Sequence, residues 1–381
     1  MEDQASALRR RRLRDICRAR RFSMPEGLRI LMGCLPDKNP VIAQLINALS
    51  DNASISCVHC SADGFWRRPQ RYDVLHIQWP EALTNWQEPS EAEIAALKAG
   101  LQAWKIGTRI VVTVHNRFPH NHDTKRFREL YNIVYSAADG IIHLGRASLE
   151  EFSVTYPAMR AKPQFVILHG NYSCLPNTVT RIEAREWLHI CNKEYVCLSF
   201  GELRNNREVR LLLQGFRLLR TPRKRLVIAG RLRASPNRLA SLLCKWHICL
   251  RRNILHINAY IPDCQVQYYL HACDVMVIPR IASLNSGNVA LGFTFGKVVV
   301  GPNDGVIGEM LRENGNPVFD PGNIESLACA LQEGLRFGQT DLGDQNRIFA
   351  LKQLNWSRIA AQHESFYRLL LQKARVKESS P

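Results

Sequence analysis

The sequence contains no apolar run near the roughly 18 to 20 residues that a helix needs to cross a bilayer. Its arginine-rich beginning also lacks the apolar stretch of a secretory signal peptide, so we expect a cytoplasmic protein. Acidic residues are scarce, because 34 Asp and Glu stand against 51 Lys and Arg and leave a net charge of +17. A surface of that charge attracts nucleotide phosphates, nucleic acid or anionic lipid headgroups, and the charge alone does not choose between them.

Several patterns that define binding modules are also missing. The chain has no helix-turn-helix, RNP-like or zinc-finger pattern, which disfavours a nucleic-acid-binding domain. Its 12 cysteines are scattered through apolar segments and are typical of small buried side chains that stay reduced. The close pair Cys57 and Cys60 has no second pair at zinc-ribbon spacing, so we predict no metal site there.

The positive charge is densest at the beginning, in "LRRRRLRDICRARRF". Its apolar residues share part of one helix face among the arginines, as in a helix on an anionic inner leaflet, where each basic residue contributes about 1 kcal/mol. Met24 begins "MPEGLRILMG", which leads directly into the first predicted strand. Residues 1–23 are therefore either an interfacial helix or a basic N-terminal tail, and the sequence leaves both open.

Short β-branched runs alternate with helical stretches, the pattern of parallel sheets with crossover helices. A first series predicts strands near 28–33, 54–59, 73–78, 109–114, 140–143 and 164–168. A second series predicts strands near 195–200, 225–229, 253–258, 274–278, 297–300 and 316–319. A polar, turn-rich segment separates them and sets a boundary near 175–190. We predict an α/β protein with domains at 24–180 and 190–355, and a helix at 356–377 that packs back on the first domain.

Polar side chains follow these strands at their carboxyl ends. In the first series they lie in "WPE" with Trp79 and Glu81, "HNRFPH" with His115, Asn116 and His120, and "HGNY" with His169 and Tyr172. In the second series "GELRNNR" and "GPND" hold the same position. Ligands of open parallel sheets bind at this edge, so two such sheets facing one another would form a ligand cleft. Gly, Pro and Asn also simply make turns, but that explanation covers three histidines and a glutamate less well.

A helix is predicted to begin within "NSGNVALGF". The first turn of a helix has unpaired N–H groups and a partial positive charge, so Ser286, Gly287 and Asn288 are expected to face a phosphate. In the alternative, Ser286 merely caps the helix while its apolar side chains face the core. Arg204 and Arg207 of "GELRNNR" are expected as cationic partners of the same anion.

The order "GELRNNR", "LVIAGR", "ACDVMVIPR", "LNSGNVALGFTFGKVVVGP", "GVIGE" and "GNPVFDPGN" resembles the nucleotide-sugar-binding half of GT-B glycosyltransferases of the GT4-like group. The motifs "NPVIAQLINAL", "YDVLHIQWPE", "TVHNRFPH" and "VILHGNY" resemble bacterial exopolysaccharide β-mannosyltransferases of the xanthan-pathway type. The resemblance covers about residues 28–370. It implies two Rossmann-like domains facing an interdomain cleft, with the acceptor in the first and the nucleotide sugar in the second.

The resemblance and the strand-end positions together give the candidate site. Expected donor-binding residues are Gly201, Arg204, Arg207, Asn285, Ser286, Gly287, Asn288 and Glu309. Expected acceptor or cleft residues are Asn39, Trp79, Asn116, His169 and Tyr172. Many GT4-like enzymes carry two glutamates eight positions apart around the phosphate-binding helix, and here those positions hold Ser283 and Leu291. This departure puts a retaining mechanism in doubt.

The resemblance implies transfer of a hexose, with mannose from GDP-mannose as the leading donor, to a lipid-linked oligosaccharide in exopolysaccharide biosynthesis at the inner face of the plasma membrane. The sequence has no DxD motif of metal-using sugar transferases, so we expect no metal and no cofactor besides the donor. A β-linked product from an α-linked donor requires one inverting displacement and a base for the acceptor hydroxyl.

Glu81, His115 and His120 are the catalytic candidates, with His169 as a further possible base. Glu81 is slightly favoured, because a carboxylate beside Trp79 in a cleft can have a raised pKa, although it is equally typical of a loop cap. Two other functions stay open. One is a GT-B enzyme that uses UDP-glucose or UDP-glucuronate, and the other is a non-catalytic basic protein that binds nucleotides or nucleic acid.

Overall fold

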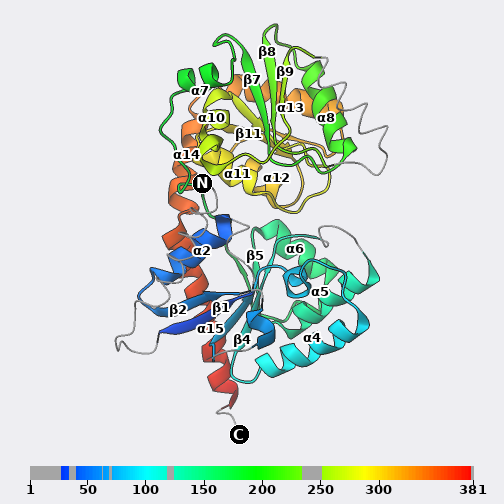
Figure 1. The fold of residues 1–381 in the computed structure, drawn as a ribbon, viewed down its shortest axis with the longest axis vertical. Coiled ribbons are helices and arrows are strands. Elements are labelled where there is room, and N and C mark those ends of the chain that lie inside the picture. Colours follow the sequence, from blue (N-terminus) through cyan, green and yellow to red (C-terminus); the bar gives the residue numbers. More distant parts are fainter. Residues whose placement is uncertain are drawn as a thin grey trace, which may run out of the picture. The chain divides into compact units, whose positions relative to one another are not determined.

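The computed structural model describes residues 27–33, 40–61, 63–67, 71–117, 124–233 and 251–378 (Figure 1). Asn39, His120 and the basic segment 1–23 lie outside these residues. The chain forms two compact units. Unit 1 comprises Met1–His143, Tyr156–Ile167 and Ile359–Pro381, and unit 2 comprises Leu144–Thr155 and Leu168–Arg358.

Unit 1 contains a six-stranded parallel sheet in the order β2-β1-β3-β4-β5-β6. Its strands are β1 (Leu28–Met32), β2 (Ile55–Cys60), β3 (Val74–Ile77), β4 (Arg109–Val114), β5 (Gly140–His143) and β6 (Gln164–Val166). Its helical elements are α2 (Pro40–Ser50), α3 (Gly64–Arg67), η2 (Pro80–Thr84), α4 (Glu91–Trp104), α5 (Lys125–Ala137), η3 (Pro157–Met159) and most of α15 (Trp356–Glu378).

Unit 2 contains a second six-stranded parallel sheet in the order β12-β11-β10-β7-β8-β9. Its strands are β7 (Tyr195–Phe200), β8 (Lys224–Ala229), β9 (Ile254–Ile257), β10 (Val275–Val277), β11 (Val298–Pro302) and β12 (Val318–Phe319). Its helices are α6 (Arg146–Thr155), α7 (Arg181–Trp187), α8 (Asn206–Leu218), α10 (Asp263–Ala272), α11 (Gly287–Thr294), α12 (Gly305–Glu313), α13 (Ile324–Phe337) and α14 (Leu342–Gln353). The α/β class and all twelve predicted strands are confirmed.

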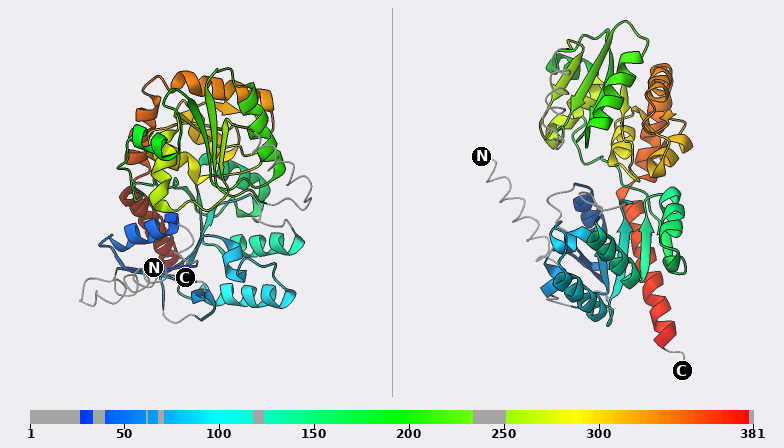
Figure 2. Two further views of the ribbon diagram at one scale, coloured as in Figure 1. Left: turned by 45° about the horizontal axis from the view of Figure 1, so that its top comes forward. Right: turned by 90° about the vertical axis from the view of Figure 1, so that its right-hand side faces the viewer.

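The core of unit 2 follows from the two-residue period of its strands. Val196 and Leu198 of β7 enter one apolar cluster with α7, α10, α11 and α14, while Tyr195 and Cys197 enter another with α8 and α13. Both faces of the sheet are therefore covered by helices, as Figures 1 and 2 show for this unit. Coverage on both faces explains why β7 and β11 are buried along almost their whole length instead of alternating between buried and exposed residues.

Each sheet has one point where the strand order reverses. In unit 2 the chain runs outward from β7 through β8 and β9, and then returns to β10 on the other side of β7. In unit 1 the same reversal occurs between β1 and β3. Loops diverge at such a switch point and leave a crevice at the carboxyl ends of the strands, where ligands of these folds bind. The polar motifs after β3 and β7 thus stand at these two positions.

The part of the chain that the structure describes contains no helix long and apolar enough to cross a membrane.

Arg185 of α7 fixes the edge of unit 2 opposite that crevice. Its side chain is fully buried and donates hydrogen bonds to the carbonyl oxygens of Ala272, Asn192 and Glu194 at 3.0, 2.8 and 3.0 Å. It also pairs with Asp274 at 2.9 Å. One guanidinium therefore joins α7, α10 and the loop before β7.

Arg185→Ala is expected to lower the free energy of unfolding by about 3 to 5 kcal/mol, because it leaves buried carbonyl groups and a carboxylate without this donor. Arg181→Ala is the matched control, since Arg181 binds the same Asp274 from a half-exposed position. That variant should lose less than about 1 kcal/mol. Urea denaturation measures both, and equal losses would show that the buried network adds nothing beyond the surface pair.

Candidate functional site

Helix α11 begins where the sequence predicts. Ser286 is its N-cap residue, and the Ser286 hydroxyl accepts a long hydrogen bond of 3.4 Å from the Asn288 N–H. Val289 and Phe293 are buried in the core. The cap and the small first turn are therefore both present, so the capping role and the expected phosphate-binding role do not exclude one another.

The first turn of α11 is tied to the central strand of unit 2. The Asn288 side-chain amide donates a hydrogen bond of 2.7 Å to the carbonyl oxygen of Phe200, the last residue of β7. Gly201 follows with a φ of +87°, a left-handed conformation that glycine adopts without strain. Asn288 thereby positions α11 beside the carboxyl end of β7, and its amide is used for this contact.

Two further predicted residues, His169 and Tyr172, lie against the first turn of α11. A side-chain carbon at Gly287 would overlap the Tyr172 hydroxyl and would come within 3.1 Å of the His169 Nε2. The two rings stack with centroids 5.7 Å apart. His169 Nδ1 donates to the carbonyl oxygen of Gly170 at 2.8 Å, and burial lowers the pKa of the His169 ring. The ring is therefore neutral near pH 7, with its Nε2 lone pair near Gly287.

A buried cationic cluster lies after β7 and β10. The Arg280 guanidinium pairs with the Glu208 carboxylate at 2.7 Å, and both side chains are buried. The same Glu208 oxygen accepts the backbone N–H of Arg204 at 2.8 Å. Desolvation and the charge of Arg280 lower the pKa of Arg204 to about 10. The Glu208 carboxylate is thus paired with the Arg280 guanidinium and with the backbone of Arg204, and the charge of the Arg204 side chain is left over in this cluster.

Arg280 has one donor left over. Its Nε is buried and has no hydrogen-bond partner among the described residues. The Arg204 guanidinium lies 3.5 Å from the Ser283 hydroxyl, at one of the positions where GT4-like enzymes have a glutamate. A buried donor without a partner is costly, which marks this cluster as a candidate anion site. Sequence reasoning missed Arg280, although the motif "VIPR" at the end of β10 contains it.

The remaining predicted donor residues have other surroundings. Arg207 is exposed in the first turn of α8, and the Asn285 carbonyl oxygen accepts the Ser283 hydroxyl at 2.9 Å. Glu309 lies on α12, where its two carboxylate oxygens accept the N–H groups of Arg146 and Ala147 at 2.9 and 2.7 Å. Glu309 therefore caps α6, and its role in donor binding stays a prediction.

In unit 1, His115 belongs to a chain of hydrogen bonds behind the end of β3. Its Nε2 donates to the Gln78 side-chain oxygen at 2.9 Å, so the neutral ring carries its lone pair on Nδ1. Gln78 in turn contacts His76, which pairs with Thr113 at 2.8 Å and with Tyr367 at 2.7 Å. Burial, followed by the charges of His363 and His115, lowers the pKa of His76. The network holds the His115 ring in one tautomer.

Trp79 covers the His115 ring, with centroids 4.4 Å apart and planes 23° from parallel. Asn116 follows directly and is partly exposed. Trp79, His115 and Asn116 therefore meet at the carboxyl ends of β3 and β4.

Glu81 faces a different environment. Its side chain is only 2% exposed, and it forms a hydrogen bond with Tyr131 of α5. Burial and the nearby Glu81 charge raise the pKa of Tyr131, which therefore stays protonated and donates. The carboxylate is thus held against α5 inside unit 1. Among the described residues of this edge, the partly exposed His115 is better placed to meet a substrate.

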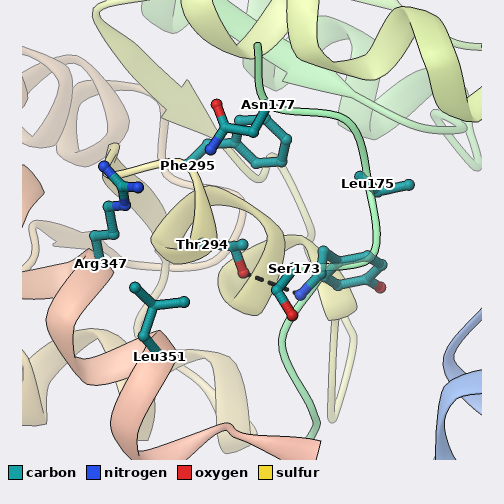
Figure 3. Close-up of a pocket in the computed structure, with 8 residues that line it drawn as sticks. Ser173, Leu175, Asn177, Thr294, Phe295, Arg347 and Leu351 are labelled. Carbon is teal, nitrogen blue, oxygen red and sulfur yellow. Dashed lines mark hydrogen bonds between the residues drawn. The ribbon is translucent and has the colours of Figure 1, made fainter.

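A small pocket lies beside the other end of α11 (Figure 3). It is lined by Tyr172, Ser173, Leu175, Asn177, Thr294, Phe295, Arg347 and Leu351. Its volume of about 190 Å³ is below the roughly 300 to 1,000 Å³ of most ligand sites. The Tyr172 N–H donates to the Thr294 hydroxyl at 3.1 Å, so the loop that carries His169 is hydrogen-bonded to the last residue of α11. Within the described residues, no group of His, Cys, Asp or Glu side chains is arranged to hold a metal ion.

The chain is similar to known sugar-transferring proteins. Residues 180–340 match the family model described as glycosyl transferases group 1. Two curated relatives from Xanthomonas campestris pv. campestris are named GDP-mannose:glycolipid 4-beta-D-mannosyltransferase. One is 26% identical over 347 residues, which cover 86% of this chain and 88% of the relative. The other is 27% identical over 279 residues and covers 69% of this chain.

Solved structures agree on the fold. Sucrose-phosphate synthase from Thermosynechococcus elongatus superposes with a TM-score of 0.68 at 15% identity and covers 91% of this chain and 100% of that chain. The Anabaena protein HepE, solved in complex with UDP, also gives 0.68 at 16% identity and covers 88% of this chain and 98% of that chain. At these identities the likeness establishes the two-domain fold and says nothing about the substrate.

Gly287→Ala is expected to weaken GDP binding by about tenfold, because the new methyl group displaces the Tyr172 hydroxyl and crowds the helix N-terminus where a phosphate would lie. Tyr172→Phe in the same chain removes the overlapping oxygen and should restore part of the affinity. Calorimetry with GDP measures both variants. Wild-type affinity in Gly287→Ala would place the phosphate away from α11.

Proposed function

We propose that this chain, which is a GT-B glycosyltransferase with a group 1 glycosyl transferase domain at residues 180–340, transfers mannose from GDP-mannose to a lipid-linked oligosaccharide. The observation that carries the proposal is the buried cluster of Arg204 and Arg280, in which the Arg280 Nε has no partner among the described residues and the Arg204 guanidinium lies 3.5 Å from the Ser283 hydroxyl. The names of the Xanthomonas relatives support the mannosyl donor and the glycolipid acceptor. On this proposal the enzyme acts in exopolysaccharide biosynthesis.

The donor diphosphate occupies the positive region of unit 2. When the sugar departs, negative charge develops on the β-phosphate oxygen, and fixed donors lower the barrier because they need no reorganisation. The N–H groups of the first turn of α11 and the guanidinium groups of Arg204 and Arg280 supply such donors. This arrangement stabilises the leaving group with the chain's own residues, so the proposal includes no metal ion.

The transfer inverts the anomeric carbon. GDP-mannose is an α-linked donor, and the relatives are named for a β-linked product, which one direct displacement gives. In that step the acceptor oxygen forms its bond to the anomeric carbon as the bond to the β-phosphate oxygen breaks. A base takes the proton from the acceptor hydroxyl.

His115 is the base in this proposal. Gln78 fixes its tautomer through the bond to Nε2, which leaves the lone pair of the neutral ring on Nδ1. Glu81, the candidate that the sequence slightly favoured, is buried against Tyr131 and holds the η2 turn next to Trp79. The base and its support thus come from neighbouring strands, β3 and β4.

The acceptor is attached to a lipid, so the enzyme is expected to work as a peripheral protein at the inner face of the plasma membrane. The net charge of +17 supports this location, because an anionic surface attracts such a protein over a short, salt-dependent distance. A basic nucleic-acid-binding protein would share the charge but would have no use for a buried pair of arginines beside a helix N-terminus.

Arg204→Ala should weaken GDP binding by about 10- to 100-fold, because a charge-assisted contact to phosphate contributes about 1.5 to 3 kcal/mol. Arg210→Ala is the matched control, since Arg210 is an exposed arginine of α8, the helix that follows Arg204 in the sequence. Calorimetry with GDP and UDP reports both the site and the base preference. Tighter binding of UDP than GDP would favour the UDP-sugar alternative, and equal losses in both variants would remove the assignment of Arg204.

His115→Ala should slow mannosyl transfer by about 100-fold or more with little change in GDP affinity, because no base on the enzyme then takes the proton from the hydroxyl group of the acceptor sugar. In the wild type the single-turnover rate should rise with pH until the ring is neutral. Glu81→Gln keeps the size of the side chain and should leave this pH profile in place. A flat profile in Glu81→Gln with a normal rate in His115→Ala would return the base role to Glu81, and an α-linked product by NMR would exclude inversion.

A further inference from the structure

A strained turn follows η2 in unit 1. Asn85 and Trp86 have φ values of 50° and 63°, so two consecutive residues with side chains adopt the left-handed conformation. Asn tolerates this region, whereas a bulky Trp there is an outlier that the surroundings must impose. The Trp86 N–H donates to the Glu81 carbonyl oxygen at 2.8 Å and so closes the turn. Strain of this kind is concentrated at functional sites, which directs attention to what the turn presents.

The turn presents an indole ring beside the candidate base. The Trp86 side chain is 37% exposed and lies 5.9 Å from Trp79, at an angle of 48°. Trp79 in turn stacks on His115 at 4.4 Å. Three aromatic rings thus form a row at the carboxyl ends of β3 and β4, with the exposed Trp86 at its outer end.

The chemistry of this row suits a neutral sugar. The face of an indole carries partial negative charge, and the axial C–H groups of a pyranose carry partial positive charge and present an apolar surface. The row itself holds no formal charge when His115 is neutral. The residues after the turn, Gln87 and Glu88, are exposed, and the acidic Glu88 would repel an anionic phosphate or an anionic bilayer.

We propose that Trp86 and Trp79 form a stacking platform for a pyranose ring of the acceptor and hold it beside His115. The platform rests on the proposed function, because it requires that the acceptor be a glycan. Trp86 and Trp79 are positioning residues, since they hold the sugar while His115 takes the proton. The left-handed turn is the device that keeps the Trp86 ring outside the core, where a substrate can reach it.

Trp86→Gly removes the indole ring and at the same time relieves the backbone strain of the turn. Glycine adopts a φ of 63° without steric cost, so relief of strain offsets part of the stability that is lost with the buried part of the ring, and the variant should fold. We expect its affinity for cellotetraose and mannotetraose to fall by about tenfold, as when a stacking contact is lost. Calorimetry measures the affinity, and transfer assays with the lipid-linked acceptor should show a raised KM with a smaller change in kcat. Trp86→Phe keeps an aromatic face and should recover most of the affinity.

Two controls isolate the ring. Asn85→Gly relieves strain in the same turn but keeps Trp86, so it should bind both sugars as the wild type does. Trp187→Ala removes an indole that is similarly exposed, at 44%, on unit 2, and should have no effect on sugar binding. Unchanged sugar affinity in Trp86→Gly, or no binding of either tetrasaccharide by the wild type, would overturn the platform.

A membrane role for the ring is a distinct outcome. Loss of binding to phosphatidylglycerol vesicles by Trp86→Gly with unchanged tetrasaccharide affinity would make Trp86 a membrane anchor and overturn the proposal. The test is also separable from the donor assignment. If the wild type fails to use GDP-mannose while Trp86→Gly still loses sugar binding, then the donor is wrong and the platform stands. Normal mannosyl transfer with an unchanged acceptor KM in Trp86→Gly would instead reject the platform alone.

Discussion

The parallel direction of all strands is the constraint on which both candidate sites depend. Because every strand in a sheet ends at the same edge, the segments after β3 and β4, or after β7 and β10, meet although they are far apart in the sequence. The reversal of strand order then opens a crevice at that edge. Function can gather there without disturbing the core, because the central strands, such as β7 and β11, are buried along almost their whole length.

The balance of charge at the β7 edge depends on Glu208. Its carboxylate lies between Arg280 and the backbone of Arg204, and it neutralises one positive charge where two are present. Burying a guanidinium without a partner is costly, so the carboxylate makes the cluster stable enough to fold. One donor of the cluster is still unsatisfied, since the Arg280 Nε has no partner among the described residues. The fold therefore contains a local deficit of negative charge that an anionic ligand would fill.

Sequence reasoning recovered the regular elements well and the side-chain directions less well. The twelve strands and the start of α11 were predictable, because β-branched runs and small helix-capping residues act locally. The position of Glu81 was not, since the Tyr131 that holds it lies on α5, 50 positions away by the sequence numbering. Glu309 illustrates the same limit, because the α6 backbone that it caps is distant in the chain. The left-handed conformation of Trp86 could not be predicted from the sequence, since within "TNWQE" only the asparagine is a residue type that favours it.

The His169 loop has a consequence for how the second unit can be divided. Asn171 is hydrogen-bonded to the chain at and just after the end of α14. Its backbone N–H and side-chain amide donate to the carbonyl oxygens of Leu354 and Ala350, and its carbonyl oxygen accepts the indole N–H of Trp356. The Trp356 ring also lies so close to Gly170 that a side chain at Gly170 would overlap it. The segment 180–340 that matches the family model contains none of these contacting residues, neither those of the His169 loop nor those at the end of α14. A protein shortened to that segment would keep the arginine cluster but lose the wall formed by His169 and Tyr172, so the recognisable family region is smaller than the cooperative unit that supports it.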